Sequence, residues 1–208
     1  NGLGAAVSDM LNSFSDVASA PTDITARTVA LNRISETALR MGNTSASLDD
    51  LQQSMTLEIK NKVSTINGLA NSIALVNEKI VRTQGNGQPP NDLLDKRDQL
   101  LLELNQHIQA TTIPATDGSL SVYIGGSQAL VLGNSAASLS LTQDDFGVLN
   151  SKLALNRNGD TIPLNENTLG GGEVPGMLRF QNTDLAEACN LLGRYSVGVT
   201  TSMNNQHR

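Results

Sequence analysis

Branched aliphatic residues recur at a fixed spacing in the stretch between Leu48 and Arg82. Isoleucine returns every seven residues, and leucine or valine stands between successive isoleucines in its second half. The series comprises Ile59, Ile66, Leu69, Ile73, Val76 and Ile80, and Met55, Leu51 and Leu48 extend it towards the N-terminus. Lys62 interrupts the series, and the neighbouring Val63 can take its place. Spacing of three and four residues predicts a helix with one apolar face.

The length of this apolar face bears on the architecture. A helix rises 1.5 Å per residue, so the stretch is about 50 Å long. An apolar face of that length must be covered by other helices. The pattern alone is compatible with the core helix of an ordinary bundle, and the length favours an elongated bundle.

Two further helical patterns precede this stretch. Apolar residues follow a 3.6-residue spacing over residues 2–19, and Pro21 then ends the helix, with Thr22 or Asp23 as the cap of the next one. The second pattern starts at Ile24. At residues 42–45, Gly-Asn-Thr-Ser, the helix either breaks or continues to a total of about 60 residues. Continuity is favoured because acidic residues precede basic ones by four positions on both sides, in Glu36/Arg40, Glu58/Lys62 and Glu78/Arg82.

A loop over residues 84–90 separates this long helix from a third one, which Asn91 or Asp92 is expected to cap. Because the connection is short, the third helix is predicted to pack antiparallel onto the isoleucine face. A last helix is predicted to begin near residues 182–183. Its inner face comprises Leu185, Cys189, Leu192, Val199 and Met203, with Cys189 as a small buried apolar residue.

The apolar pattern changes its period from 3.6 to 2 at Thr111. Apolar and polar residues then alternate around 119–124, 138–142 and 152–156. Turns are expected at Asp117-Gly118, Gly125-Gly126, Gly133-Asn134, Asp145-Phe146-Gly147 and Asn158-Gly159. One-sided alternation is typical of an antiparallel meander with one face towards solvent.

The predicted fold class is α+β and mainly α. It is an elongated antiparallel helical bundle with long coiled-coil-like helices and a small antiparallel β module. Residues 1–109 and 166–208 are expected to form the elongated helical rod domain, into which the module of residues 110–165 is inserted. A glycine-rich passage over residues 170–176 precedes the last helix.

Composition narrows the possible functions. The 208 residues include 14 basic and 20 acidic ones, a net charge of −6, so the basic footprint of nucleic-acid-binding proteins is missing. No polybasic segment or long apolar run favours a membrane. Aromatic residues make up 2%, fewer than ligand pockets usually recruit. One cysteine excludes an internal disulfide and fits either a cytosolic chain or one exported unfolded through a narrow channel. Neither nucleic acid nor membrane is expected as a partner.

Two sequences approximate chemical motifs without their context. Residues 125–129, Gly-Gly-Ser-Gln-Ala, approximate a nucleophile elbow, but strands are predicted on both sides and Ala129 replaces the final glycine. A hairpin turn is the better interpretation. Asn156, Asn158 and Asp160 lack the glutamate that would complete a calcium loop.

The histidines do not suggest a site either. His107 and His207, with one cysteine, are too few for a structural zinc site. His107 is at a helix end, where a cation is favoured, and the sequence places no catalytic partner near it. No catalytic, cofactor-binding or metal-binding residue is therefore expected.

The densest group of charges is Asp92, Asp95, Lys96, Arg97 and Asp98. It is either a salt-bridge patch between subunits or a capped, solvated helix face with an Asp92/Lys96 pair, and the second interpretation is favoured. Arg97 lies among leucines on the helical wheel, so it is predicted to be partly buried and paired.

Two stretches resemble a known family. The residues PNDLLDKRDQL at 90–100, followed by Glu103-Leu104, closely resemble the PNDLLDxRDxLxxEL signature of the bacterial flagellar hook-associated protein 1 family, the hook–filament junction proteins. Gly176–Phe180 stands where the family has GGLLxFR. Leu185, Leu192-Gly193 and the Asn-Asn-Gln-His run at 204–207 match its L…LG…NxQH segment. The departures are Gln181 in place of an arginine, and Glu173-Val174-Pro175 within a glycine-rich turn.

The resemblance implies a structural role without catalysis. Such proteins form a ring of subunits that joins the flagellar hook to the filament, with terminal helices, absent here, that build the inner tube. The implied partners are further copies of the same protein, the hook protein, the neighbouring hook-associated protein, and an export chaperone that acts through the missing C-terminal part. The implied location is the extracellular flagellum, reached by type III export without a cleaved signal peptide. Composition alone leaves a secreted helical adhesin or effector as the alternative, and no constellation of residues supports an enzyme.

Overall fold

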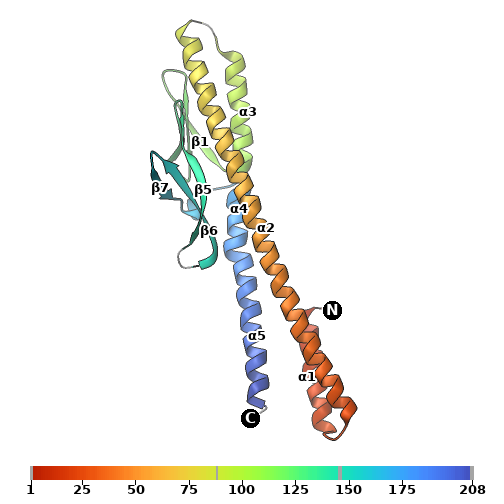
Figure 1. Ribbon diagram of the computed structural model, residues 1–208. Coiled ribbons are helices and arrows are strands. Elements are labelled where there is room, and N and C mark those ends of the chain that lie inside the picture. The colour runs from red at the N-terminus through yellow and green to blue at the C-terminus, as the bar shows by residue number, and fades with distance from the viewer. Residues whose placement is uncertain (1, 88, 145–146, 207–208) are drawn as a thin grey trace. The chain divides into compact units, whose positions relative to one another are not determined.

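The computed structural model describes residues 2–87, 89–144 and 147–206 of the chain. The chain divides into two compact units, of which the first comprises Asn1–Leu51 and Glu187–Arg208 and the second Gln52–Ala186. All described strands belong to the second unit (Figure 1). The α+β, mainly α class is confirmed. The division into a helical domain and an inserted module at residues 110–165 stays a prediction.

Two helices open the chain as expected. Helix α1 spans Leu3–Ser19, and α2 spans Ile24–Gly85 without a break at Gly42. Asp23 Oδ1 accepts a hydrogen bond from the Thr25 N–H at 2.8 Å and thereby caps α2. The three expected ion pairs form along α2, at Glu36/Arg40, Glu58/Lys62 and Glu78/Arg82. Ion pairs at a solvated helix surface contribute little to stability, so they support the helix without holding the fold.

Helix α3 spans Asn91–His107 and runs back beside α2 (Figure 1). The prediction that Asn91 or Asp92 caps it is wrong, because Pro90 occupies the capping position and no side chain does so. The Pro90 carbonyl instead accepts from the N–H groups of Leu93 and Leu94, both at 3.0 Å. Asp92 lies in the first turn, where its charge complements the helix dipole.

The last helical segment begins earlier than predicted. Helix α4 spans Glu173–Arg179, a π-helical turn η2 spans Phe180–Leu185, and α5 spans Ala186–Gln206. The predicted start near residues 182–183 is wrong because the chain becomes helical directly after Gly172. Pro175 did not prevent this, since proline is tolerated in the first turn of a helix. The expectation of a buried Cys189 is also wrong, because the residue is half-buried.

The strands form two antiparallel sheets where one meander was expected. The first has the order β1 (Ala110–Pro114), β2 (Leu120–Ile124), β3 (Gln128–Leu132), β4 (Ser135–Ala136). The second has the order β5 (Ser138–Asp144), β6 (Gly147–Arg157), β7 (Asp160–Pro163). The turn at Gly125-Gly126 has φ values of 57° and 83°, and Asn158-Gly159 has 53° and 92°, as tight hairpins require. Residues 145–146 of one expected turn lie outside the described part.

One hydrophobic core joins helices and sheets in the second unit. The four isoleucines of the α2 face are fully buried. Three of them, Ile59, Ile66 and Ile73, share a cluster with Leu104 of α3, Ile108 directly after it, Val122 and Ile124 of β2, and Leu153 and Leu155 of β6. This confirms the heptad as core and α3 as its neighbour. The proposed extension of the face to Leu51 is wrong, since that side chain is 40% exposed.

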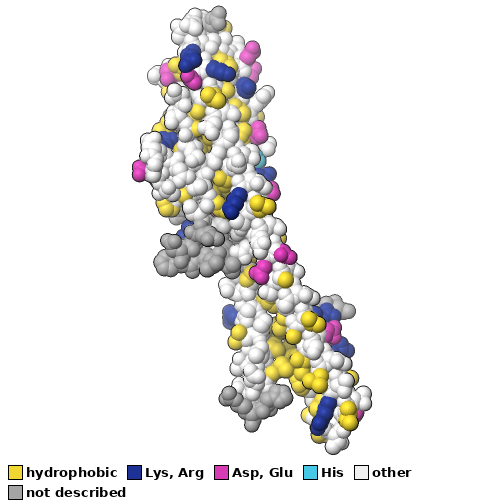
Figure 2. Space-filling view, viewed as in Figure 1, with side chains coloured by type: hydrophobic (Ala, Val, Ile, Leu, Met, Phe, Trp, Pro, Cys, Tyr) yellow, Lys and Arg dark blue, Asp and Glu magenta, His cyan; other side chains and the backbone are white. Residues whose placement is uncertain are grey.

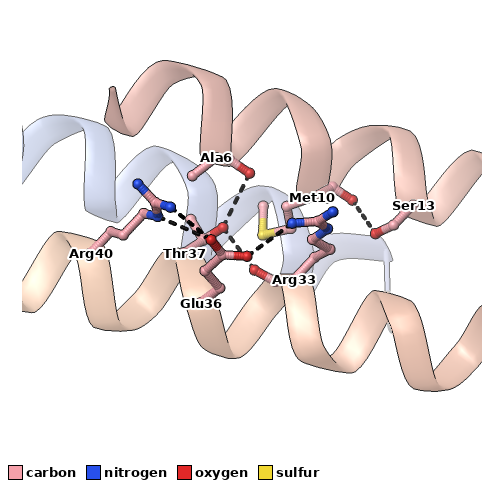
Figure 3. A network of polar contacts seen from close by, with 7 residues as sticks. All are labelled: Ala6, Met10, Ser13, Arg33, Glu36, Thr37 and Arg40. Atoms are coloured by element: carbon pink, nitrogen blue, oxygen red, sulfur yellow. Dashed lines mark hydrogen bonds and ion pairs between the residues drawn. The ribbon is translucent and has the colours of Figure 1, made fainter. Parts of the chain in front are cut away.

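The first unit has a much smaller core. Its buried apolar side chains among the described residues are Ala6, Val7, Met10 and Ala30. Thr37 fixes α1 against α2, because its hydroxyl lies 2.8 Å from the Arg33 carbonyl and 3.2 Å from the Ala6 carbonyl (Figure 3). Glu36 bonds Arg33 and Arg40 beside this contact.

The α2 face supplies a direct test of the core. We expect Ile73→Asp to destabilise the protein by several kcal/mol, because it buries an unpaired carboxylate at a fully buried position. Leu75→Asp is the matched control two residues away, since Leu75 is 58% exposed, and its cost is expected to stay within about 0.5 kcal/mol. Urea unfolding measures both, and equal midpoints for the two variants would show that the isoleucine face is not core.

Candidate functional site

The residues that approximate chemical motifs in the sequence serve as turn residues or as hydrogen-bond partners within the fold. Ser127 lies in the turn between β2 and β3, with no helix behind it, so the hairpin interpretation is confirmed. Asn156 donates to Ser140 Oγ at 2.9 Å and accepts from Thr161 Oγ1 at 2.8 Å, which uses its side chain within the second sheet. His107 lies against α4, with Nδ1 2.7 Å from Glu173 Oε2. His207 lies outside the described residues.

The described part of the chain shows neither a cluster of metal ligands nor a membrane-spanning helix. Among residues 2–87, 89–144 and 147–206, no three His, Cys, Asp or Glu side chains gather as metal ligands would. None of the helices in that part is long and apolar enough to cross a bilayer.

The charged group on α3 separates into one buried cation and an exposed face. Asp92, Asp95, Lys96 and Asp98 are exposed, and Asp92 and Lys96 form no ion pair in the described structure. Arg97 is 9% exposed, and burial lowers the pKa of its guanidinium. Its Nη1 donates to the Gly118 carbonyl at 2.9 Å and to Asn77 Oδ1 at 3.2 Å. Arg97 is therefore buried and paired as predicted, with neutral oxygens as its partners.

Asn77 of α2 is the centre of a buried polar network between helices and sheet. Its Oδ1 accepts from the Leu120 N–H at 3.1 Å, and its Nδ2 donates to the Leu120 carbonyl at 2.7 Å. The same Nδ2 lies 2.8 Å from the Gly133 carbonyl. The side-chain amide thus pairs with a β2 residue as a neighbouring peptide group would, while Arg97 supports it from α3.

Two other asparagines repeat this arrangement. Asn67 of α2 accepts from the Leu139 N–H at 2.7 Å and donates to the Leu139 carbonyl at 2.9 Å, which holds β5. Asn182 of η2 accepts from the Ser151 N–H at 3.0 Å and donates to the Ser151 carbonyl at 2.9 Å, which holds β6. We call these three pairs, at Asn67, Asn77 and Asn182, the amide clamps. Sequence reasoning missed all three, and the only available signal was that Asn67 and Asn77 directly follow the core residues Ile66 and Val76.

The first unit contains an apolar groove between α1 and α5. Two adjoining hollows of about 470 and 320 Å³ share Leu11, Ser202 and Met203. Phe14 and Val17 continue the α1 wall, and Figure 2 shows hydrophobic side chains gathered along this hollow. A long apolar groove between helices is the geometry that receives another helix.

Several apolar side chains of the first unit are exposed, and one of them, Leu11, lines the groove. Leu11 is 54% exposed, and the following residues of the same unit are also more than half exposed: Ile24, Leu31, Leu39, Leu191 and Val197. Among its described residues, this unit buries four apolar side chains and leaves these six more than half exposed. Apolar surface on this scale typically marks a site of protein association. The groove is therefore the candidate interaction surface, and its apolar lining suits the binding of a protein segment.

Comparisons with known proteins agree on one family. The model of the flagellar hook-associated protein FlgK helical domain matches residues 1–208. The chain is 27% identical over 209 residues to flagellar hook-associated protein 1 of Escherichia coli K12, which covers 99% of the chain and 38% of that protein. It is 22% identical over 183 residues to the protein of the same name in Bacillus subtilis, covering 84% of the chain and 35% of the relative.

A solved structure has the same fold. The flagellar hook junction protein FlgK from Burkholderia pseudomallei matches 86% of the chain with a TM-score of 0.80 and 26% identity, and the match covers 33% of that protein. The chain thus spans less than two-fifths of the length of the relatives that it matches.

The Asn77 network yields a stability prediction. We expect Asn77→Ala to cost about 2–4 kcal/mol, because it removes the side-chain partner of the buried Leu120 backbone groups and the donor to the Gly133 carbonyl. It also removes one of the two acceptors of Arg97 Nη1, which keeps the Gly118 carbonyl. Asn71→Ala on the same helix is the control, since Asn71 is exposed and carries the same change in helix propensity. The measurement is urea unfolding, and a loss no greater than the control would mean that the network contributes nothing to stability.

Proposed function

This chain belongs to the flagellar hook-associated protein FlgK helical-domain family, and from that membership we propose that it serves as a structural part of the junction between flagellar hook and filament. The observation that carries the proposal is the match of the family model over all 208 residues. The signature at residues 90–104 supports it physically, because its arginine, Arg97, reaches into the network that fastens the β2 strand to α2 and α3.

The role proposed is mechanical, with no catalysis. In the second unit, Asn67, Asn77 and Asn182 use their side-chain amides to bind backbone groups of the strands. In the first unit, the apolar groove is suited to binding a protein segment. The alternative of a secreted adhesin or effector would need its own recognition surface, and family membership favours the flagellar role over it.

The proposed partners follow from this role. We infer an assembly with further copies of the same protein in a ring, and contacts with the hook protein and the neighbouring hook-associated protein. Export through the flagellar type III pathway without a cleaved signal, aided by a chaperone that binds another part of the protein, belongs to the same proposal. The location is then the extracellular flagellum.

For the groove we propose an occupant from the same protein. The chain spans 38% of its enterobacterial relatives, so most of a protein of that kind lies elsewhere. An apolar helix face from that remainder would complete a bundle with α1 and α5, whose apolar residues are spaced for helix packing. Leu11, which lines the groove and is 54% exposed, belongs to the surface that such a helix would cover.

Deletion of the gene in the source bacterium tests the junction role. We expect hooks without filaments by electron microscopy and filament subunits lost to the medium, because the filament would lack its attachment. Expression of the full-length gene from a plasmid should restore the filaments. Normal filaments and motility after deletion would contradict the proposal and favour the adhesin or effector.

Cysteine labelling tests the groove occupant. In a Cys189→Ser background, we expect Leu11→Cys to react quickly with a maleimide in the 208-residue chain and at least about tenfold more slowly in the full-length protein, because burial removes thiol reactivity. Leu102→Cys is the control, since Leu102 is 70% exposed on α3, far from any groove residue in sequence, and should react equally in both. Equal labelling of Leu11→Cys in both proteins would contradict the occupant, and protection that grows with protein concentration would assign the groove to a second copy.

A further inference from the structure

Asparagine directly precedes glycine in three pairs within the described part of the chain, at residues 67–68, 86–87 and 158–159. This dipeptide is prone to spontaneous loss of the side-chain amide, because glycine has no Cβ to shield its backbone nitrogen. The reaction needs two groups to meet, the side-chain carbonyl carbon of the asparagine and the backbone nitrogen of the glycine. The surroundings of each pair therefore determine whether it can react.

The pair at residues 67–68 is held at both groups. Both residues lie within α2, so the backbone nitrogen of Gly68 belongs to the helical hydrogen-bond ladder. The Asn67 side chain forms an amide clamp, in which Oδ1 accepts from the Leu139 N–H at 2.7 Å and Nδ2 donates to the Leu139 carbonyl at 2.9 Å. Reaction at this pair requires that both the helix and the clamp open.

The pair at residues 86–87 is held at one group. It directly follows α2, and both residues are exposed. The Gly87 N–H nevertheless donates to the Gln84 carbonyl at 2.9 Å, which keeps the backbone nitrogen engaged. This hydrogen bond must break before the nitrogen can attack the Asn86 side chain.

The pair at residues 158–159 is held at neither group. It forms the two-residue turn between β6 and β7, with φ values of 53° and 92°. Both residues are exposed, and no described residue hydrogen-bonds the Asn158 side chain or the Gly159 N–H. All four residues of β7, an edge strand, are exposed as well. The turn can therefore change its backbone angles while few contacts are broken.

We propose that Asn158–Gly159 is a site of spontaneous deamidation, whereas the amide clamp protects the same dipeptide at residues 67–68. The Gly159 nitrogen gives up its proton to hydroxide and attacks Asn158 Cγ. The new N–Cγ bond closes a five-membered imide, and the Cγ–Nδ2 bond breaks as the amide group takes up a proton from water and leaves as ammonia. Water then opens the ring at either carbonyl, which yields aspartate or isoaspartate without any oxidation or reduction. This inference does not depend on the proposed flagellar function.

The modification changes both the charge and the geometry of the hairpin. Either product adds a carboxylate two residues before Asp160, and like charges so close together repel. Isoaspartate also adds one carbon to the main chain, which a two-residue turn with Arg157 paired to Asp160 cannot accept without rearranging. Arg157 Nη2 donates to the Ala129 carbonyl at 2.8 Å, so this rearrangement reaches the contact between β6 and β3.

Peptide mapping by mass spectrometry tests the site in the purified full-length protein. The protein is kept in mildly alkaline buffer, and samples are digested with pepsin in acid, which stops the reaction. Deamidation adds about 1 Da to a peptide. We expect the peptide with Asn158 to gain this mass at least about tenfold faster than the peptide with Asn67, because the helix and the clamp open rarely. In concentrated urea, which unfolds the chain, the two pairs should react at similar rates because only the shared dipeptide remains.

The Asn158→Asp variant is the matched control, because it carries one of the two products from the start. Its peptide with residue 158 should gain no mass, while the peptides with Asn67 and Asn86 should behave as in the parent protein. Faster reaction at Asn158 than at Asn67 in the folded protein, with similar rates in urea, supports the proposal. A rate at Asn158 no greater than that at Asn67 in the folded protein overturns it, because the turn would then protect its own pair.

Discussion

The fold depends on how a helix, whose own backbone groups are already paired, can satisfy the backbone of a sheet packed against it. Buried N–H and carbonyl groups of a strand need partners, and at Asn77 the contact with Leu120 is buried away from water. Only side chains can supply both a donor and an acceptor there, and asparagine places both at peptide spacing. Asn67 and Asn77 lie about 15 Å apart along α2 and hold one sheet each, and Asn182 adds a second attachment to the sheet of β5–β7.

The two units differ in how completely they bury their own apolar side chains. The second unit encloses its isoleucine face with α3 and two sheets, and its polar contacts fix the register of those pieces. The first unit leaves leucines and valines exposed and contains an apolar groove. One unit is therefore a finished core, and the other presents surface for association, which is what a part of a larger assembly requires.

Much of the helical pattern could be predicted because it is local. The seven-residue repeat located the core face of α2, and acid–base pairs justified continuity through Gly42. The start of the last helix was misplaced because glycines at 170–172 suggested a longer loop, while the contact of Gly172 with His107 comes from distant sequence. The division into two sheets occurs at Ala137, between β4 and β5, where no glycine or proline marks a turn. The clamps and the His107–Glu173 contact were unpredictable for the same reason, since their partners are 31 to 72 residues away.

The amide clamps also affect how the protein responds to the salt concentration around it. A side-chain amide paired with a peptide group carries no net charge, so dissolved ions do not screen the pair, whereas the ion pairs along α2 weaken as salinity rises. The attachment of sheets to helices at Asn67 is of the uncharged kind throughout. A change in salinity should therefore leave the attachment of β5 to α2 at Asn67 unchanged while it weakens the ion pairs along the same helix.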